Sequence, residues 1–278
     1  MLIRKSNAWK SDTRLAKHLA LDWSRLVRMA DARRKISHSI VIPALNESDR
    51  IGLTIEDIYK FMPQKYPKFE LIVVDDGSQD DTRAVVGKLQ GQFNNLMLTP
   101  ERQNLGKGFS VKQGMLASRG DLRLFMDADG STHIRHLEFL MSALDEGFDI
   151  VIGSRNIEGA NIAVRQPWYR EQMGRTFNFC VKWLAGINYE DTQCGFKLFS
   201  ADAADMIFSR QKMDRFAFDV ELLYLASKFG LKVAEFPVTW LDCPRSKVNP
   251  LTAPINMFMD VLRVRWMHWG EKYSHDGH

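Results

Sequence analysis

The sequence predicts an α/β protein with a mostly parallel sheet and helices on both faces. Apolar runs rich in Val, Ile, Leu and Phe alternate along the chain with amphipathic stretches of helical period. This alternation is typical of a parallel sheet that is covered on both faces. The composition agrees, because 45% hydrophobic and 26% charged residues in 278 residues suit one ordinary globular domain. Disordered, collagen-like and low-complexity classes are excluded.

The predicted elements follow one another through the middle of the chain. Each strand is an apolar run that ends at turn residues, and each helix has polar residues near its start. The predicted strands are His38–Ala44, Phe69–Asp75, Asp121–Asp127 and Phe148–Ser154. The predicted helices are Arg50–Phe61, Asp80–Leu89, Gly108–Ser118 and Ile134–Leu144. Ligands of such sheets bind beyond the carboxyl ends of the strands, so the residues after each strand are the candidates for chemistry.

Residues 1–37 are predicted to form a separate basic, amphipathic helical segment. Residues 1–38 hold ten Lys and Arg against three Asp, a formal +7 in a chain whose total is +4. From Ser11 to about Lys35, apolar residues recur at helical spacing, and cations occupy most of the remaining surface. Such a helix can lie in a lipid interface, or its apolar stripe can pack on the protein's own core or on a second subunit.

Residues 251–278 are predicted to be an interfacial helix and tail that follow a main domain of residues 38–250. Ile255–Trp269 is rich in Met, Val and Trp and contains Arg263 and Arg265. Trp and Arg together suit a membrane interface, although the segment could equally be core. No stretch has the ~20 consecutive apolar residues of a membrane span, and the N-terminus lacks a secretory signal. A cytoplasmic protein, attached peripherally to the inner face of the membrane, is expected.

The cysteines and histidines do not indicate a zinc site or a disulfide framework. Cys180, Cys194 and Cys243 are odd in number and form no Cys-x-x-Cys pair, so reduced thiols are expected. His133 and His136 are three residues apart on a predicted helix, where a solvated face explains them better than a metal.

Carboxylates directly follow three of the predicted strands. Glu47 follows the first strand, Asp75 and Asp76 close the second, and Asp127 and Asp129 close the third. Converging carboxylates repel one another unless a cation or hydrogen-bond donors offset their charge, which a hard divalent metal does. Asp127 and Asp129 are therefore predicted to hold Mg²⁺ or Mn²⁺, which would also bind a diphosphate and stabilise a leaving nucleoside diphosphate. The alternative is a helix cap and a turn aspartate.

Lys107 stands between two glycines at the start of a predicted helix. The surrounding residues 104–108 match neither the Walker pattern nor the dinucleotide-binding pattern of glycines. A lysine at a helix start still favours a nearby anion, so Lys107 is predicted to lie on the donor side of the site. A plain helix-entry turn is the alternative.

Taken in order, the motifs resemble the family of inverting glycosyltransferases with the GT-A fold. The motifs of the first half are Pro43-x-x-Asn46-Glu47, Val74–Ser78, Asn104-x-Gly106-Lys107-Gly108, Asp127-x-Asp129 and Gly153-Ser154-Arg155. Those of the second half are Asp191–Phe199, Arg215–Tyr224, Val238-x-Trp240 and Ser246-Lys247. The second set looks closest to the dolichyl-phosphate β-glucosyltransferases, and the match covers roughly residues 37–270.

This resemblance implies transfer of glucose from UDP-glucose to a polyprenyl phosphate, of the dolichyl or undecaprenyl type, at a membrane surface, with no nucleic-acid partner. It also implies a role for each matching residue. The nucleotide would be held by Pro43, Leu45, Glu47, Asp76, Lys107 and Asp127, and the metal by Asp127 and Asp129. Arg155 and Lys247 would meet the donor or lipid phosphate, and a loop with Arg165 and Arg170 would close over the site. Apart from the resemblance, we expect Lys197 to serve the acceptor phosphate together with Arg155 and Lys247. Asp219 and Glu221 are expected to contact sugar hydroxyls, or to be acids at a helix N-terminus that its dipole stabilises.

The chemistry expected of such an enzyme is consistent with the residues. A lipid phosphate has its second pKa near ~6, so at pH 7 it is largely a dianion and needs no strong general base. This fits the absence of an evident Ser-His-Asp or Cys-His set. Two alternatives use related sites: a GDP-mannose-dependent polyprenyl-phosphate mannosyltransferase, and a nucleotidyltransferase, for which a glycine-rich N-terminal loop is lacking. A homo-oligomer formed through the tail helices is left open.

Overall fold

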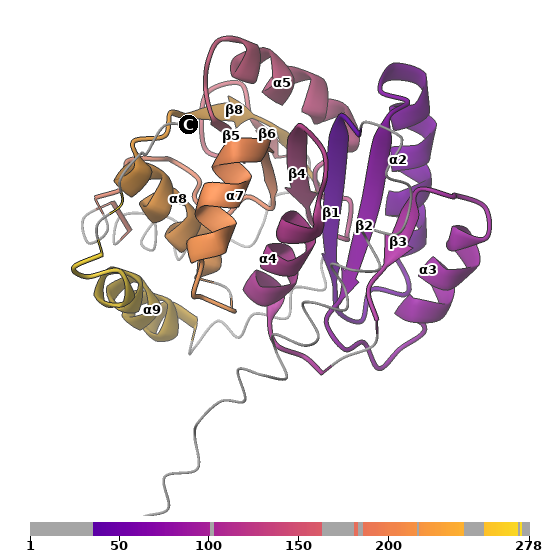
Figure 1. Ribbon diagram of the computed structural model, residues 1–278, viewed down its shortest axis with the longest axis horizontal. Coiled ribbons are helices and arrows are strands. Elements are labelled where there is room, and N and C mark those ends of the chain that lie inside the picture. The colour runs from indigo at the N-terminus through magenta and orange to yellow at the C-terminus, as the bar shows by residue number, and fades with distance from the viewer. Residues whose placement is uncertain are drawn as a thin grey trace, which may run out of the picture. The chain divides into compact units, whose positions relative to one another are not determined.

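The protein is described by a computed structural model that covers residues 36–100, 103–162, 181–182, 186–215, 217–241, 253–271 and 273. From residue 36 onward the described residues belong to one compact unit, in which a central sheet is flanked by helices on both faces (Figure 1). The predicted N-terminal helical segment lies outside the described residues.

Seven strands form the main sheet in the order β3-β2-β1-β4-β7-β5-β8. They are β1 (His38–Ala44), β2 (Phe69–Asp75), β3 (Leu96–Leu98), β4 (Leu122–Met126), β5 (Ile150–Ser154), β7 (Phe196–Ser200) and β8 (Val233–Pro237). Neighbouring strands are parallel, except that β7 is antiparallel to both β4 and β5. Two short strands, β6 (Asn161–Ile162) and β9 (Thr239–Trp240), pair separately. The expected mostly parallel sheet is thus confirmed, and the carboxyl ends of β1, β2 and β4 meet at one edge.

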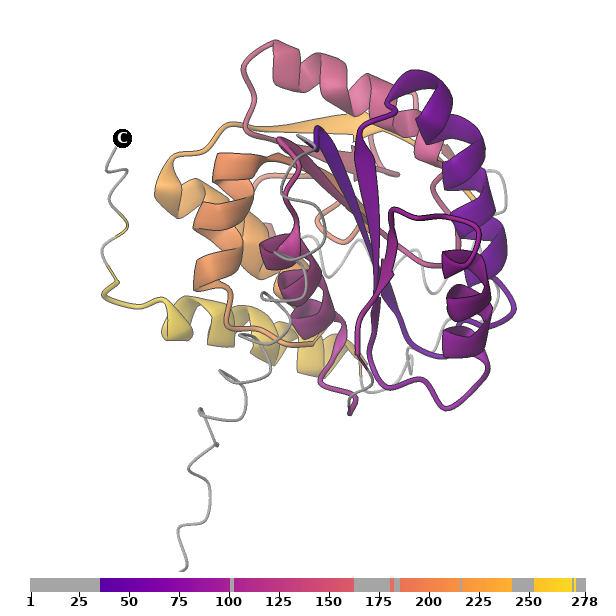
Figure 2. The same cartoon turned by 45° about the vertical axis from the view of Figure 1, so that its right-hand side comes forward.

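Helices cover both faces of the sheet (Figure 2). One face carries α2 (Ile51–Lys65), α3 (Thr82–Gln90) and α5 (Leu137–Asp145), whose apolar residues share one core cluster with the strands. The other carries α4 (Lys107–Ala117), α7 (Ala201–Arg210) and α8 (Phe218–Phe229). On that face Phe125 of β4 stacks on Phe199 and meets Phe218 of α8 at a ring-centroid distance of 5.8 Å. The central strands are therefore buried on both sides, as the near-continuous apolar runs predict.

The predicted elements of the middle region are all present. The strands 38–44 and 69–75 have the predicted bounds, and the two later strands are shorter by one or two residues at an end. The predicted helix 134–144 begins with a single 3₁₀ turn, η1 (Ile134–His136), before α5. The C-terminal helix, α9 (Ala253–Met267), starts and ends two residues earlier than the segment 255–269 that the sequence indicated.

Among the described residues, no helix combines the length and the apolar character that a crossing of the bilayer requires. Helix α9 nevertheless exposes large apolar side chains. Trp266 is 76% exposed, and Trp269 just beyond the helix is 78% exposed.

Candidate active site

The site is centred on Asp127, the first residue after β4. Its main-chain N–H donates to the carbonyl oxygen of Gly195, the residue before β7, at 3.0 Å. Gly195 also lies directly against the side chain, because a Cβ atom built on it would come within 2.1 Å of Oδ2 of Asp127. The antiparallel pairing of β4 with β7 brings these two residues together. The backbone at 195 therefore forms a wall behind the carboxylate.

Lys107 faces the same carboxylate from the start of α4. Its Nζ lies 2.7 Å from Oδ1 of Asp127, and the two side chains remain 25% and 36% exposed. Burial lowers the pKa of Lys107, but the carboxylates of Asp127, Asp219 and Asp129 outweigh burial, so the pKa lies above its usual value. Lys107 is thus a permanent cation at neutral pH beside the expected diphosphate position. The position of Lys107 between two glycines predicted a nearby anion, and in this structure the anion next to it is the Asp127 carboxylate.

Asp129 belongs to a chain of contacts that reaches the first strand. Its Oδ1 accepts from the N–H of Ser131 at 2.9 Å, and its Oδ2 lies 3.8 Å from Nη1 of Arg50. Arg50 in turn donates through Nε to Glu47 at 2.8 Å. Arg50 thus joins two predicted site residues. The sequence did not single it out, because nothing in the local pattern distinguishes a contact between the loops after β1 and β4.

Asp76 is buried and holds the loop before Lys107. Its two carboxylate oxygens accept from the N–H groups of Leu105 and Gly106, each at 2.9 Å. Its expected contact with the nucleotide stays a prediction, as do those of Pro43, which is buried in β1, and of the half-buried Leu45.

Arg155, at the end of β5, is engaged by a buried aspartate. It forms a two-pronged ion pair with Asp191, with Nε to Oδ2 at 2.6 Å and Nη2 to Oδ1 at 2.9 Å. Its guanidinium also lies 5.3 Å from the ring centroid of Trp240. Burial raises the pKa of Asp191, but Arg155 outweighs this effect and brings the pKa below its usual value. Arg155 keeps 25% of its side chain exposed, which leaves a face for an anion.

Lys197 lies in a different place from the one that its expected role beside the acceptor phosphate requires. The side chain, in the middle of the sheet on β7, has no exposed surface. Its Nζ donates to Oδ1 of Asp219 at 2.5 Å and to the carbonyl of Cys194 at 2.6 Å. The expected direct contact of Lys197 with a phosphate is therefore corrected: its ammonium group is enclosed in the protein and engaged by Asp219 and a main-chain carbonyl. Lys197 neutralises Asp219, whose pKa is raised by burial despite Lys197 and Lys107.

Three predicted site residues, Lys247, Arg165 and Arg170, lie outside the described residues, and their roles stay predictions. Within the described ranges no group of three or more His, Cys, Asp or Glu side chains is placed to hold a metal. The protein side chains would supply only part of the ligand set of a divalent ion. Asp127 and Asp129 offer partly exposed carboxylates on one loop, and hard cations of this kind commonly take their remaining ligands from substrate phosphates and water.

The fold and the site define a nucleotide-sugar-dependent glycosyltransferase. The model of the family described as "Glycosyl transferase family 2" matches residues 39–215, and the chain belongs to this family. Among curated proteins, the dolichyl-phosphate beta-glucosyltransferase of Dictyostelium discoideum is 36% identical over 83% of this chain and 74% of its own length. The protein of that name from Homo sapiens is 34% identical over 82% of this chain and 74% of its own length.

Solved structures confirm the fold. Glucosyl-3-phosphoglycerate synthase from Mycobacterium tuberculosis, crystallised with Mn²⁺, UDP and glucosyl-3-phosphoglycerate, superposes with a TM-score of 0.61 at 21% identity, over 94% of this chain and 85% of that one. Mannosyl-3-phosphoglycerate synthase from Rubrobacter xylanophilus gives a TM-score of 0.62 at 21% identity, over 93% of this chain and 86% of that one. These likenesses confirm the expected GT-A-like fold. The family itself is shown by the family model and by the curated relatives.

Proposed function

We propose that this enzyme transfers glucose, with inversion, from UDP-glucose to the phosphate of a polyprenyl phosphate. The observation that carries the proposal is the agreement among relatives. Dolichyl-phosphate beta-glucosyltransferases from animals, yeast, an amoeba and a protozoan are 32–37% identical to this chain over 81–83% of its length.

On the donor side, the proposal uses the charges around Asp127. A divalent metal bound by Asp127 and Asp129, as the Mn²⁺ in the mycobacterial neighbour suggests, would neutralise charge on the diphosphate. Lys107 adds a second positive charge, and Arg50 orients Asp129 through Oδ2. Charge that develops on the leaving UDP would then meet fixed cations instead of mobile water, which is the arrangement that favours a transition state.

On the acceptor side, the requirement is position. The phosphate dianion attacks the anomeric carbon directly, so a covalent sugar intermediate and a strong base are unnecessary. We assign the acceptor phosphate to Arg155 and Lys247 and the closing loop to Arg165 and Arg170. Asp219 is assigned to a sugar hydroxyl; its partner Lys197 holds its carboxylate in place.

We also propose that the enzyme works as a peripheral protein on the cytoplasmic face of the membrane that holds its lipid acceptor. Helix α9 supports this placement. Its last turns expose Trp266 together with Arg263 and Arg265, and Trp269 is exposed just beyond the helix, a combination that membrane interfaces favour.

The test offers purified protein a choice of donor and acceptor. UDP-glucose and GDP-mannose, each labelled in the sugar, are combined with short-chain polyprenyl phosphate, with the same alcohol lacking phosphate, or with 3-phosphoglycerate. Of the two donors, we expect only UDP-glucose to transfer its label into the organic phase, and only when the lipid phosphate is the acceptor. Addition of a chelator should abolish this transfer. Transfer from GDP-mannose would show that the proposed donor is wrong, and product formed with 3-phosphoglycerate alone would show that the proposed acceptor is wrong.

A further inference from the structure

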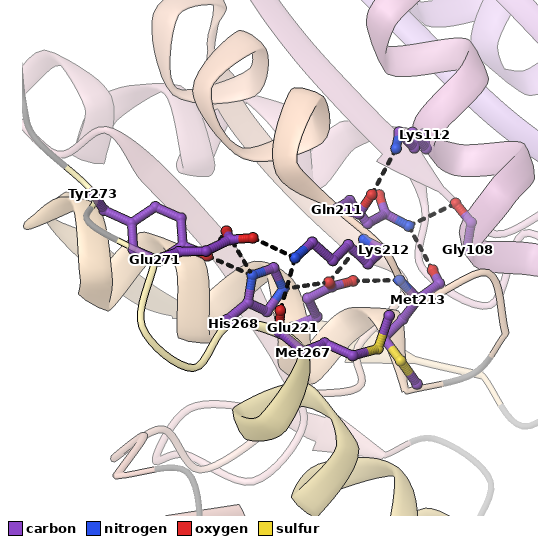
Figure 3. Close-up of polar contacts among 10 residues, drawn as sticks. All are labelled: Gly108, Lys112, Gln211, Lys212, Met213, Glu221, Met267, His268, Glu271 and Tyr273. Carbon is purple, nitrogen blue, oxygen red and sulfur yellow. Dashed lines mark hydrogen bonds and ion pairs between the residues drawn. The ribbon is translucent and has the colours of Figure 1, made fainter.

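Glu221 of α8 lies in the motif Arg215–Tyr224, two residues after Asp219, and is completely buried. Its carboxylate nevertheless has three partners, which Figure 3 shows. Oε1 accepts from the N–H of Lys212 at 2.8 Å and lies 2.7 Å from Nε2 of His268, while Oε2 accepts from the N–H of Met213 at 2.8 Å. Both oxygens therefore hold the loop that follows α7.

That loop, residues 211–215, packs against the start of α4. The carbonyl of Asp214 accepts from the N–H of Phe109 at 3.0 Å. A Cβ atom on Gly106 would lie 2.3 Å from that same carbonyl oxygen, and one on Gly108 would lie 2.5 Å from the carbonyl oxygen of Met213. Gly106 and Gly108 are thus required by the approach of loop 211–215, and they flank Lys107.

Side chains of the same loop reinforce this contact. Nε2 of Gln211 donates to the carbonyls of Gly108 at 2.9 Å and of Met213 at 2.8 Å, and Nζ of Lys112 donates to the carbonyl of Gln211 at 2.6 Å (Figure 3). The main chain on which Lys107 stands is therefore supported from one side by a loop that Glu221 holds from the other.

The end of α9 completes the arrangement. His268 is 2% exposed, and its Nδ1 lies 2.5 Å from the hydroxyl of Tyr273. Lys212 of the loop donates to the carbonyl of Met267 at 2.7 Å and to Glu271 at 2.5 Å. The C-terminal helix is thus joined to the loop by main-chain and side-chain contacts.

We propose that Glu221 is a positioning residue for Lys107, and that His268 fixes the Glu221 carboxylate, so that the end of α9 belongs to the machinery of the donor site. The line of contact runs from His268 through Glu221 and loop 211–215 to Lys107, which meets Asp127. The inference rests on the proposed donor-side role of Lys107 and does not depend on the identity of the acceptor.

Glu221→Gln tests the first link with little change in volume. A carboxamide cannot accept from both Lys212 and Met213, because one of its two ends is a donor. We expect the Kd for UDP with Mn²⁺ to rise about tenfold and kcat to fall by a similar factor, with the KM for the lipid unchanged. Val264→Ala is the matched control. It removes two buried methyl groups of α9 and lowers Tm, but it keeps the main-chain carbonyl that accepts from the N–H of His268, so UDP binding should stay within about twofold.

A double-mutant cycle with Lys107→Met decides whether Glu221 acts through Lys107. We expect Glu221→Gln to weaken UDP binding about tenfold in the wild-type background and less than about twofold in the Lys107→Met background. Losses that simply add would overturn the inference, as would normal UDP binding by Glu221→Gln beside a clear loss in Lys107→Met. If Lys107→Met itself binds UDP normally, the donor-side role of Lys107 fails together with the inference.

Two substitutions at His268 keep the inference testable if Glu221→Gln does not fold. In His268→Gln the amide nitrogen can donate to Glu221 in place of Nε2, whereas His268→Leu offers no donor. We expect the glutamine variant to bind UDP nearly as the wild type does and the leucine variant to bind it several-fold more weakly. Equal affinities in the two variants would overturn the role of His268.

Discussion

Gly195 lies so close to Asp127 that its missing side chain is part of the site. A Cβ atom at position 195 would lie 2.1 Å from Oδ2 and 2.5 Å from Oδ1 of the Asp127 carboxylate. Gly195 therefore closes one side of the carboxylate, while Lys107 meets its Oδ1 at 2.7 Å and the side chain keeps 36% of its surface exposed. The backbone of Gly195, just before β7, thus limits the directions from which a ligand can reach Asp127, just after the neighbouring strand β4.

We expect Gly195→Ala to lower kcat about a hundredfold or more, because the new methyl group must displace the Asp127 carboxylate from the position in which we propose that it binds the metal. Stability should fall by about 1–3 kcal/mol, the usual cost of overpacking. Steady-state kinetics and Mn²⁺ titration measure the first effect, and chemical denaturation the second. Gly87→Ala is the control: it lies in helix α3 with nothing within 4 Å of the new atom, so activity should be unchanged and stability equal or slightly higher.

Asp129→Asn should abolish metal-dependent transfer with little change in fold. The amide oxygen can still accept from the N–H of Ser131, which retains the local turn, but the charge that a divalent ion requires is lost. Transfer assays over a range of Mg²⁺ and Mn²⁺ concentrations, with circular dichroism as the check on folding, measure this. Asp57→Asn, an exposed carboxylate paired with Lys60, serves as the control and should retain full activity. Normal turnover by Asp129→Asn at low metal would remove the metal role of this residue.

Asp191→Asn should destabilise the protein at pH 7 by about 2–3 kcal/mol, somewhat less than for a fully buried pair because Arg155 is partly exposed. The pKa of Asp191 is lowered in the folded protein, so its contribution is present above the unfolded value near ~4 and disappears as the pH falls through the folded value. Urea unfolding from pH 7 down to pH 3.5 should therefore show the gap between wild type and variant narrowing only below about pH 4.

The matched control for that ion pair is Asp205→Asn. Asp205 also pairs with an arginine, Arg123, through two contacts, but its side chain is 60% exposed. The Asp205 carboxylate lies mostly in water, and the buried Arg123 keeps its hydrogen bonds to the carbonyls of Gly120 and Met115, so the control should lose only about 1 kcal/mol at pH 7. A loss equal to that of Asp191→Asn would assign the effect to charge alone and not to burial.

Cys194 should resist alkylation in the native enzyme. Burial raises the pKa of its thiol to about 12, so almost none of the reactive thiolate is present at pH 8. Treatment with iodoacetamide, followed by peptide mass spectrometry, should leave the peptide with Cys194 unmodified until denaturant is added. Rapid labelling of the native protein would show that the segment before β7 opens readily.

The strands of the first half were predictable because their signal is local. His38–Ala44 and Phe69–Asp75 are unbroken apolar runs closed by turn residues, and the structure gives them the same bounds. The three-residue strand β3 is too short to produce a period of its own. The place of β7 between β4 and β5 depends on pairing across many tens of residues, which no local pattern encodes.

Among the site residues too, those with a local sequence signal were predictable and those defined by contacts remote in sequence were not. Asp127, Asp129 and Lys107 were predicted because each stands at a strand end or helix start. Arg50 and Gly195 were missed as contacts because each acts on a residue that is remote in sequence. Lys197 was misplaced for a related reason: the sequence shows a lysine in an apolar run, and only the central position of β7, covered on both faces, shows that the lysine is buried.

The sheet order also has a consequence for folding during synthesis on the ribosome. Strand β5 has only β7 and β8 as neighbours, and both are made later in the chain. Once the first four strands have emerged from the ribosome, they can form a small parallel sheet. Strand β5 has no partner in the sheet until about residue 200 has emerged. Asp127 acquires its backing from Gly195 at the same moment. Chains that stop short of β7 should therefore hold a partly formed sheet and no donor site.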